Sequence, residues 1–332
     1  MILAADVGGT KTHVACFAAA RGRLAIAAEG RFASASYRGL PELLADFLRE
    51  SRHPVRAACV GVAGPVIDGR CEGVNLPWVV EAAELRRALR VRRVRLLNDL
   101  EALAYGTQHV PPGAFAVLQR GTAQAHGAMA IVAAGTGLGE AALVWNGRRY
   151  QAVPAEGGHA DFAPRTDVEI DLLRYLRARH GRVSCERVLS GPGLLAVYEF
   201  LRETGRGREP VWLRRAMRGT DPSPVISRAG LDGRSALCRN AIELFAALYG
   251  AEAGNAALKY LARGGVYLGG GIAPRLLPVL RGRQFLRAFR AKGRLSGLMA
   301  RMPVRVVLDE RAALYGAASE AWRDLTSTHG EG

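Results

Sequence analysis

Two kinds of hydrophobic pattern alternate along the first third of the chain. Short apolar runs predict buried strands, and apolar residues that recur every three or four positions predict amphipathic helices. The predicted strands are 2–5, 12–17, 24–30, 57–62 and 94–99, and the predicted helices are 40–49 and 81–89. The first three strands follow one another directly, as in an antiparallel meander. This order of elements predicts a mixed α/β domain.

A strand, a glycine turn and a second strand open the chain, and the same arrangement returns further along. Strand 129–133 is followed by Gly135-Thr136-Gly137-Leu138-Gly139 and then by strand 141–145. Between the two halves, Pro111-Pro112-Gly113 interrupts the pattern and is the predicted domain boundary. The recurrence predicts a duplicated domain that holds phosphate between the tips of its two hairpins.

The rest of the chain continues the α/β pattern, with one polar interruption. Further helices are predicted at 168–179, 194–201, 236–261 and 312–322, and further strands before Gly269 and at 304–308. The segment 203–221 is polar, rich in arginine and punctuated by glycine and proline, which predicts a mobile or variable insertion.

Composition narrows the class of protein without identifying it. The 332 residues suggest two domains, and 49% of them are hydrophobic. The net charge is +16, but the arginines are scattered and aromatic residues are not interleaved with the basic pairs as a base-stacking surface needs, so no nucleic-acid partner is expected. Five cysteines without a Cys-x-x-Cys pair predict neither disulfides nor a zinc site. Without a leader or a long apolar run, we expect a cytoplasmic protein with no membrane partner.

The tip of the first hairpin, Asp6-Val7-Gly8-Gly9-Thr10, is a candidate phosphate-binding segment. Gly8 and Gly9 let the backbone approach a ligand and offer N–H groups to phosphate oxygens. Thr10 adds a hydroxyl group, and Asp6 is suited to hold Mg²⁺ through water. A P-loop would instead need a longer loop that opens a helix. The alternative for these residues is a plain tight hairpin.

Asn98 and Asp99 end the predicted buried strand 94–99, at the position where open α/β sheets bind ligands. An amide and a carboxylate at this point suit a hydroxylated substrate, with Asp99 as a candidate base. Asn-Asp after a strand is also typical of a turn or a helix N-cap.

Three further segments are candidates for the site, and one of them, 153–161, has the composition of a functional loop rather than of a core. Glu156-Gly157-Gly158-His159 embeds two polar side chains among glycines, and Glu186 precedes a turn. Taken singly, each of these is also compatible with a surface, structural or metal-binding role. Gly269 and Gly270 follow a strand, where an adenine or ribose could lie against bare backbone.

Together these motifs resemble the bacterial glucokinases, within the superfamily of sugar kinases and actin-like ATPases. The matching motifs, in the family's order, are Asp6-Val7-Gly8-Gly9-Thr10, Leu97-Asn98-Asp99, Gly135-Thr136-Gly137-Leu138-Gly139, Glu156-Gly157-Gly158-His159, Glu186 before Leu189-Ser190-Gly191-Pro192-Gly193, and Gly269-Gly270-Gly271-Ile272-Ala273-Pro274-Arg275. Lys11-Thr12 departs from the Asn of many glucokinases and looks more like the repressor–ORF–kinase group. The cysteine-rich zinc motif of that group is missing here after His159.

The resemblance implies an α/β fold of two ribonuclease-H-like domains, of the actin-like ATPase type, with an interdomain cleft. The small domain would be 1–110 plus 302–332, and the large domain 111–301. The implied reaction is phosphorylation of D-glucose by ATP with Mg²⁺, feeding glycolysis, commonly in a homodimer. The alternatives are another hexose, polyphosphate as the donor, or a sugar-sensing regulator without catalysis. Asp6 and Asp99, which a sensor would not need, argue against the last.

The resemblance also implies a role for each candidate residue. Asp99 would be the base that faces the sugar 6-hydroxyl group. The other hydroxyls would be bound by Asn98, Glu156, His159 and Glu186. Gly8, Gly9, Thr10, Gly135, Thr136 and Gly137 would border the phosphates, Gly269 and Gly270 the adenosine, and Asp6 the metal.

Overall fold

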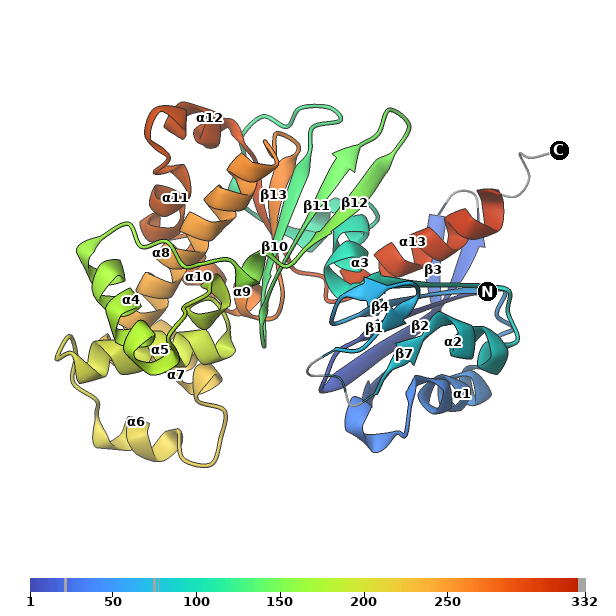
Figure 1. Ribbon diagram of the computed structural model, residues 1–332, viewed down its shortest axis with the longest axis horizontal. Coiled ribbons are helices and arrows are strands. Elements are labelled where there is room, and N and C mark those ends of the chain that lie inside the picture. The colour runs from blue at the N-terminus through green and yellow to red at the C-terminus, as the bar shows by residue number, and fades with distance from the viewer. Residues whose placement is uncertain (21–22, 74–75, 77, 328–332) are drawn as a thin grey trace. The chain divides into compact units, whose positions relative to one another are not determined.

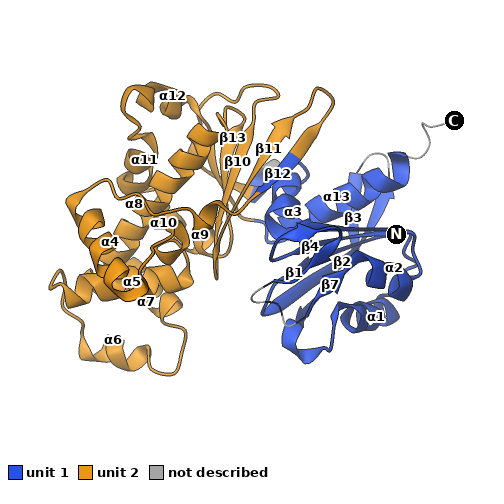
Figure 2. Cartoon of the chain, in the orientation of Figure 1, with its two compact units in different colours: residues 1–114, 152–154, 309–332 blue, residues 115–151, 155–308 orange. Residues whose placement is uncertain are grey.

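The chain forms two compact units in a computed structural model that describes residues 1–20, 23–73, 76 and 78–327 (Figure 2). The small unit comprises Met1–Ala114, Ala152–Pro154 and Asp309–Gly332, and the large unit comprises Phe115–Gln151 and Ala155–Leu308. The sequence placed 302–308 in the small domain, which is wrong for strand β14 (Val304–Val307). β14 pairs with strands β13 and β9 of the large unit, because its valines are buried in that sheet.

The small unit is built on a five-stranded sheet in the order β3-β2-β1-β4-β8 (Figure 1). The strands are β1 (Ile2–Val7), β2 (Lys11–Ala20), β3 (Arg23–Ala33), β4 (Ala57–Val62) and β8 (Arg93–Asn98). β1 is antiparallel to β2 and parallel to β4, which in turn is parallel to β8. β4 is buried along its whole length, as expected of a central parallel strand, whereas edge strand β3 is exposed at alternate residues.

Helices cover both faces of this sheet. Helices α1 (Leu40–Ser51) and α2 (Ala82–Leu89) share a core with Leu3 and other residues on one face. Alternate residues of a strand point to opposite faces, so Ile2 and Ala4 point the other way. There α13 (Ala312–Thr326) packs on β1, β4 and α3 (Asp99–Gly106). A short sheet of β5 (Val66–Ile67), β6 (Arg70–Cys71) and β7 (Val80–Glu81) completes the unit.

The large unit is built on a six-stranded sheet in the order β12-β11-β10-β13-β14-β9. Besides β14, the strands of this sheet are β9 (Phe115–Gln119), β10 (Met129–Ala134), β11 (Leu138–Trp145), β12 (Tyr150–Ala155) and β13 (Gly265–Gly269). Of β12, residues Ala152–Pro154 are assigned to the small unit. Its helices are α4 (Asp167–His180), α5 (Gly191–Glu203), α6 (Val211–Ala216), α7 (Pro222–Leu231), α8 (Ala236–Lys259), α9 (Ile272–Arg275), α10 (Leu277–Leu280), α11 (Arg283–Arg290) and α12 (Ser296–Arg301). α8 has buried residues on all sides, which marks it as the central helix of this core.

The two sheets share one strand topology. In the small unit, β1 has an antiparallel neighbour, β2, and a parallel neighbour, β4, followed by β8. In the large unit, β10 has β11 and β13 in the same positions, followed by β14. The duplication predicted from the glycine hairpins is therefore confirmed by the pairing of the strands.

One segment differs from its prediction, and another contains a helix that its composition did not indicate. β12 extends to Ala155, where the sequence indicated that a loop had begun at Val153. The expected insertion at 203–221 contains α6 and is tied to α5, because the buried Glu209 accepts hydrogen bonds from Tyr198 Oη at 2.9 Å and Arg202 Nη1 at 3.2 Å. In the part of the chain that the structure describes, no helix has the length and apolar character needed to cross a membrane.

Candidate active site

The first glycine hairpin joins β1 to β2 and is closed by its own backbone. The Gly8 N–H donates to Lys11 O at 3.0 Å, so this N–H is used in the turn. Among the described residues, the N–H groups of Gly9 and Thr10 donate to no other group. These two N–H groups, rather than that of Gly8, are therefore the hairpin donors available to a ligand such as the predicted phosphate.

A buried serine outside the hairpin, Ser34, forms hydrogen bonds to the hairpin residues. Sequence reasoning missed this residue. Ser34 Oγ donates to Gly8 O at 2.8 Å and lies 3.0 Å from Thr12 Oγ1. The Ser34 N–H donates to Thr10 O at 3.1 Å. Ser34 and Thr12 are fully buried, so their hydroxyl groups depend on each other for hydrogen bonds. A lone serine after the meander gives no sequence signal for this contact.

Asp6 lies just before the hairpin, with its carboxylate partly buried. Burial raises the pKa of Asp6 from 3.8 to about 6. Within the described residues, no group donates a hydrogen bond to this carboxylate and no cation pairs with it. A carboxylate without a protein donor fits the outer shell of a hydrated magnesium ion, which binds through few protein ligands and keeps its waters.

Asn98 and Asp99 form the junction between β8 and α3. Asn98 is the N-cap: its Oδ1 accepts the Leu100 N–H at 2.8 Å, and its own N–H donates to Glu101 Oε2 at 2.9 Å, which completes a capping box. Asn98 Nδ2 donates to Gly64 O at 3.0 Å. Asp99 is the first helical residue. The N-cap alternative is thus correct for Asn98, and it leaves the Asp99 carboxylate at the N-terminus of the helix.

The hairpin and the Asn98-Asp99 junction lie at one edge of the small unit's sheet. In the parallel register, Val7 is opposite Val62, and Val62 is opposite Asn98. β1, β4 and β8 therefore end side by side, as ligand-binding strands do in open α/β sheets. The pKa of the Cys71 thiol is raised mainly by burial and further by the charge of Asp99, so Asp99 lies close to Cys71.

The second hairpin joins β10 to β11 in the large unit and contacts Glu186. The Gly135 N–H donates to Gly137 O at 2.8 Å. Glu186 Oε2 accepts the Leu138 N–H at 2.9 Å, and a Cβ added to Gly137 would lie 2.5 Å from the same oxygen. The predicted sugar ligand Glu186 is thus anchored to the predicted phosphate hairpin, which leaves Oε1 for a substrate.

Glu156 and His159 lie on a loop that rests on β11; we call residues 156–159 the sugar loop. Both side chains are exposed, and the loop ends in a single 3-10 turn, Gly157–His159. A Cβ at Gly158 would lie 1.9 Å from Leu138 O, so only glycine allows this close approach. The next residue, Ala160, accepts the Cys185 N–H at 2.9 Å, which joins the sugar loop to the turn Cys185–Arg187, the Glu186 segment.

The glycines after β13 lie beside the second hairpin. Gly269 is paired with Ala133 of β10, and Tyr249 Oη donates to Val132 O at 2.9 Å between the two strands. Gly270 has a φ of +77°, and a Cβ there would lie 2.2 Å from Ala134 O. Glycine is therefore required at this turn, and the predicted adenosine and phosphate glycines end neighbouring parallel strands.

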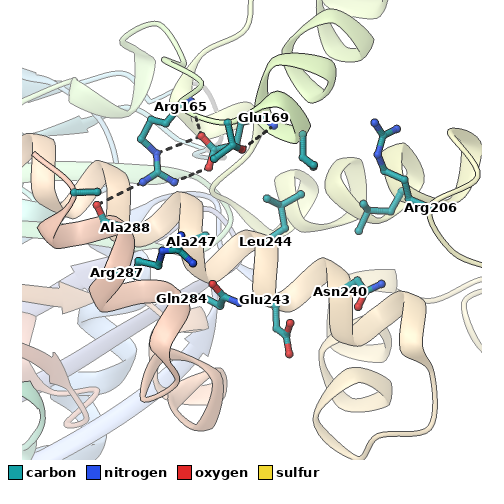
Figure 3. A pocket seen from close by; sticks show the side chains of 14 residues that line it. Arg165, Glu169, Arg206, Asn240, Glu243, Leu244, Ala247, Gln284, Arg287 and Ala288 are labelled. Atoms are coloured by element: carbon teal, nitrogen blue, oxygen red, sulfur yellow. Dashed lines mark hydrogen bonds and ion pairs between the residues drawn. The ribbon is translucent and has the colours of Figure 1, made fainter. Parts of the chain in front are cut away.

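A separate groove of about 920 Å³ lies among α4, α8 and α11 of the large unit (Figure 3). Arg165 pairs with Glu169 at its edge, with Nε 3.2 Å from Oε2, and Arg206 and Arg287 also line it. None of the residues that the sequence predicted for the site lines this groove. It is therefore not the predicted catalytic site.

Comparison with known proteins agrees with these features. A profile of the glucokinase family matches residues 3–323. The glucokinase of Nostoc sp. is 38% identical over 335 residues, which cover 96% of this chain and 98% of that protein. The crystal structure of a glucokinase from an Antarctic psychrotroph has a TM-score of 0.83 at 30% identity, covering 97% of this chain and 98% of that one. A ROK family glucokinase from Streptomyces griseus, solved with glucose and AMPPNP, has a TM-score of 0.66 at 21% identity, covering 97% and 99%, and supports the fold alone.

Two sheets of the same topology, each with a glycine hairpin at its first two strands, give this chain the actin-like ATPase fold of the sugar kinases it resembles. The predicted fold class, two ribonuclease-H-like α/β domains, is confirmed. The match extends over nearly the whole chain, and the chain belongs to the glucokinase family. The resemblance drawn from the six motifs is thereby confirmed as well.

Proposed function

We propose that this enzyme transfers the γ-phosphoryl group of ATP to the 6-hydroxyl group of D-glucose, giving glucose 6-phosphate and ADP. The observation that carries the proposal is the position of Asp99. It begins α3 at the same sheet edge as the Gly8–Lys11 hairpin, so that one edge offers a carboxylate for a hydroxyl group and N–H donors for a phosphate. Family membership supports glucose and ATP as the substrates.

Asp99 is the proposed catalytic base. Phosphoryl transfer passes through a loose transition state, so positioning and charge stabilisation dominate catalysis. A carboxylate is too weak a base to form a sugar alkoxide in advance. Asp99 therefore orients the 6-hydroxyl group by accepting its hydrogen bond and takes the proton as the bond to phosphorus forms. A base in this role contributes about 10²- to 10⁴-fold to the rate.

Four further residues are the proposed ligands of the other sugar hydroxyls: Asn98, Glu156, His159 and Glu186. The cap uses one lone pair of Asn98 Oδ1, and the bond to Gly64 O uses one hydrogen of Nδ2, so one of each remains for the sugar. Oε1 of Glu186 is the oxygen available to accept a hydroxyl group. A sugar that lacks a matching hydroxyl leaves such groups unpaired and is penalised strongly.

Both hairpins are the proposed phosphate site, with Gly9 and Thr10 of the first and Thr136 and Gly137 of the second as the proposed ligands. Gly8 and Gly135, whose N–H groups close their own turns, would border the phosphates without donating. Gly269 and Gly270 would border the adenosine. A Mg²⁺ ion held through water by Asp6 would neutralise charge on the β- and γ-phosphate oxygens. Magnesium as the metal, a homodimer, a cytoplasmic location and entry of the product into glycolysis are parts of the proposal that rest on the family.

A panel of sugars and phosphoryl donors tests this function. Purified protein with Mg²⁺ is assayed for phosphorylated product with D-glucose, D-mannose and D-fructose, each with ATP or polyphosphate. We expect the highest kcat/KM with D-glucose and ATP. A higher kcat/KM with mannose or with polyphosphate would overturn the substrate assignment, and sugar binding without any turnover would identify a sensor instead.

A further inference from the structure

Two buried glutamates lie beneath the sugar loop and have no part in the function proposed above. Glu140, on β11, is 1% exposed, and Glu252, on α8, is 5% exposed. Their carboxyl groups are within reach of each other, so a proton held by one would form a hydrogen bond to the other. Apart from that contact, the Oε1 atom of each has no hydrogen-bond partner among the described residues. Sequence reasoning missed Glu140, although a single acidic residue inside an otherwise apolar strand was a signal.

The surroundings hold too little positive charge for two carboxylates. Glu252 Oε2 accepts hydrogen bonds from Asn255 Nδ2 at 2.9 Å and Cys185 Sγ at 3.3 Å, and Oε1 lies 3.6 Å from the half-exposed Lys259 Nζ. Glu140 has no cation partner of its own in the described structure. Two neighbouring buried carboxyl groups cannot both ionise cheaply, and Glu140, which has no cation beside it, is the group on which the pair would hold a proton.

The remaining titratable groups around the pair do not change this assignment. Lys292 Nζ is held by Asn255 Oδ1 at 2.5 Å and Ala251 O at 3.0 Å rather than by a carboxylate. Tyr249 and Tyr260 have raised pKa values and stay neutral, and burial and the charge of Glu252 likewise raise the pKa of the Cys185 thiol. Burial first, and then the charge of Glu252, raise the pKa of Glu140 to about 8.

Both sugar-binding segments rest on this pair. A Cβ at Gly157 would lie 2.0 Å from Glu140 Oε2, so the backbone of the sugar loop lies directly against the Glu140 carboxyl group. On the other side, the Cys185 thiol bonds to Glu252, and Cys185 begins the Glu186 segment. The carboxyl pair thus touches the sugar loop through Gly157 and the Glu186 segment through Cys185.

We propose that Glu140 and Glu252 hold one proton between them, and that this proton positions the sugar loop and the Glu186 segment for hexose binding. The inference rests on the proposed roles of Glu156, His159 and Glu186. Glu140 and Glu252 are positioning residues, since neither touches the sugar. Loss of the proton replaces their hydrogen bond by repulsion between two buried charges, and the Gly157 backbone is the neighbour that must move.

The proposal predicts a glucose affinity that falls in alkaline solution. If only the protonated pair holds the loop in its binding position, the apparent KM for glucose rises by about 10-fold one pH unit above the midpoint of deprotonation. The KM for glucose of the wild-type enzyme should therefore rise about 10-fold between pH 7 and pH 9. The KM for ATP, whose proposed ligands do not lie on the sugar loop, should change less than about 2-fold.

Glu140→Gln is the decisive variant. A glutamine amide donates the same hydrogen bond to Glu252 and does not titrate between pH 7 and pH 9. This variant should keep the wild-type KM for glucose at pH 7 and should lose the rise at pH 9. Glu243→Gln, the same substitution on α8 outside the pair, should keep the wild-type rise and is the matched control.

Three results would overturn the proposal: a flat wild-type profile, an unchanged rise in Glu140→Gln, or an equal rise in the KM for ATP. Should Glu140→Gln not fold, Glu252→Gln replaces it. Removing the charge of Glu252 should lower, by at least one unit, the pH at which the KM for glucose begins to rise. An unchanged pH would contradict the pairing of the two glutamates. Failure of the proposed function would look different, because no variant would then form glucose 6-phosphate at any pH.

Discussion

The helix that begins at Asp99 is held in place by glycines, and Gly316→Ala tests this most sharply. Gly316 lies in α13, where it crosses α3. An added Cβ would lie 1.8 Å from Ala102 O and 2.5 Å from Gly106 N. Both neighbours are backbone atoms, so neither can rotate away. The contact would have to open to about 3.4 Å, where ordinary van der Waals contact begins.

Two effects of opposite sign set the change in the free energy of unfolding of Gly316→Ala. Overpacking costs about 1–3 kcal/mol, and alanine gains about 1 kcal/mol over glycine in a helix interior. A backbone clash belongs at the upper end of that range, so we expect a net loss of about 2 kcal/mol. In a unit of about 150 residues this lowers Tm by about 4–8 °C. Ala102 is one helical turn from Asp99, and a misplacement of about 1 Å there costs about 10²-fold in kcat.

The assay combines thermal melting with steady-state kinetics. Gly297→Ala is the matched control, because Gly297 also lies in a helix but has no atom within 4 Å of an added Cβ. It should leave kcat unchanged and Tm equal or slightly higher. Wild-type Tm and kcat in Gly316→Ala would refute the reasoning that this crossing fixes the position of Asp99.

Two further predictions concern the first hairpin. Burial raises the pKa of Asp6 from 3.8 to about 6, so the folded protein binds this proton more tightly than the unfolded chain does. The stability gained from the proton is complete below pH 3.8 and is lost as the pH rises through 6, where the buried carboxylate ionises. Asp6→Asn should therefore have a higher Tm than the wild type at pH 7.5 and the same Tm near pH 4. It should also need more Mg²⁺ for half-maximal activity. An equal Tm at pH 7.5 would contradict the burial argument. Ser34→Ala leaves Gly8 O and the buried Thr12 hydroxyl without their partner, which costs about 1–3 kcal/mol. Ser34→Ala should raise the KM for ATP more than the KM for glucose. The control, Ser36→Ala at an exposed serine, should change neither KM. Equal effects of the two variants would contradict the role of Ser34.

The features that sequence predicted were the ones with local causes. The glycines of both hairpins and the junction at Asn98-Asp99 follow from backbone and capping preferences that a few neighbouring residues express. The use of the Gly8 N–H within its own turn did not follow from residue types, since it depends on the register between β1 and β2. The placement of β14 failed for a similar reason: a short valine-rich strand fits either sheet, and only its partners decide.

Contacts between distant segments could not be predicted at all. The contact of Ser34 with Gly8, and that of Glu140 with Gly157, join residues whose spacing along the chain carries no signal. The anchoring of Glu186 by the Leu138 N–H likewise appears only when the two segments are folded together. Sequence therefore indicated the candidate site residues, and the structure adds which groups hold them.

The central claim is that Asp99 is the base of a glucose kinase. Its most direct test is the rate of glucose 6-phosphate formation from ATP by Asp99→Asn, with glucose binding measured by calorimetry on the same sample. Asp167→Asn is the matched control, because Asp167 is also the first residue of a helix, α4, and has no proposed role in catalysis. The account predicts that Asp99→Asn loses about 10²- to 10⁴-fold in kcat while glucose still binds and Asp167→Asn stays at the wild-type rate. Near-normal turnover of Asp99→Asn would contradict it.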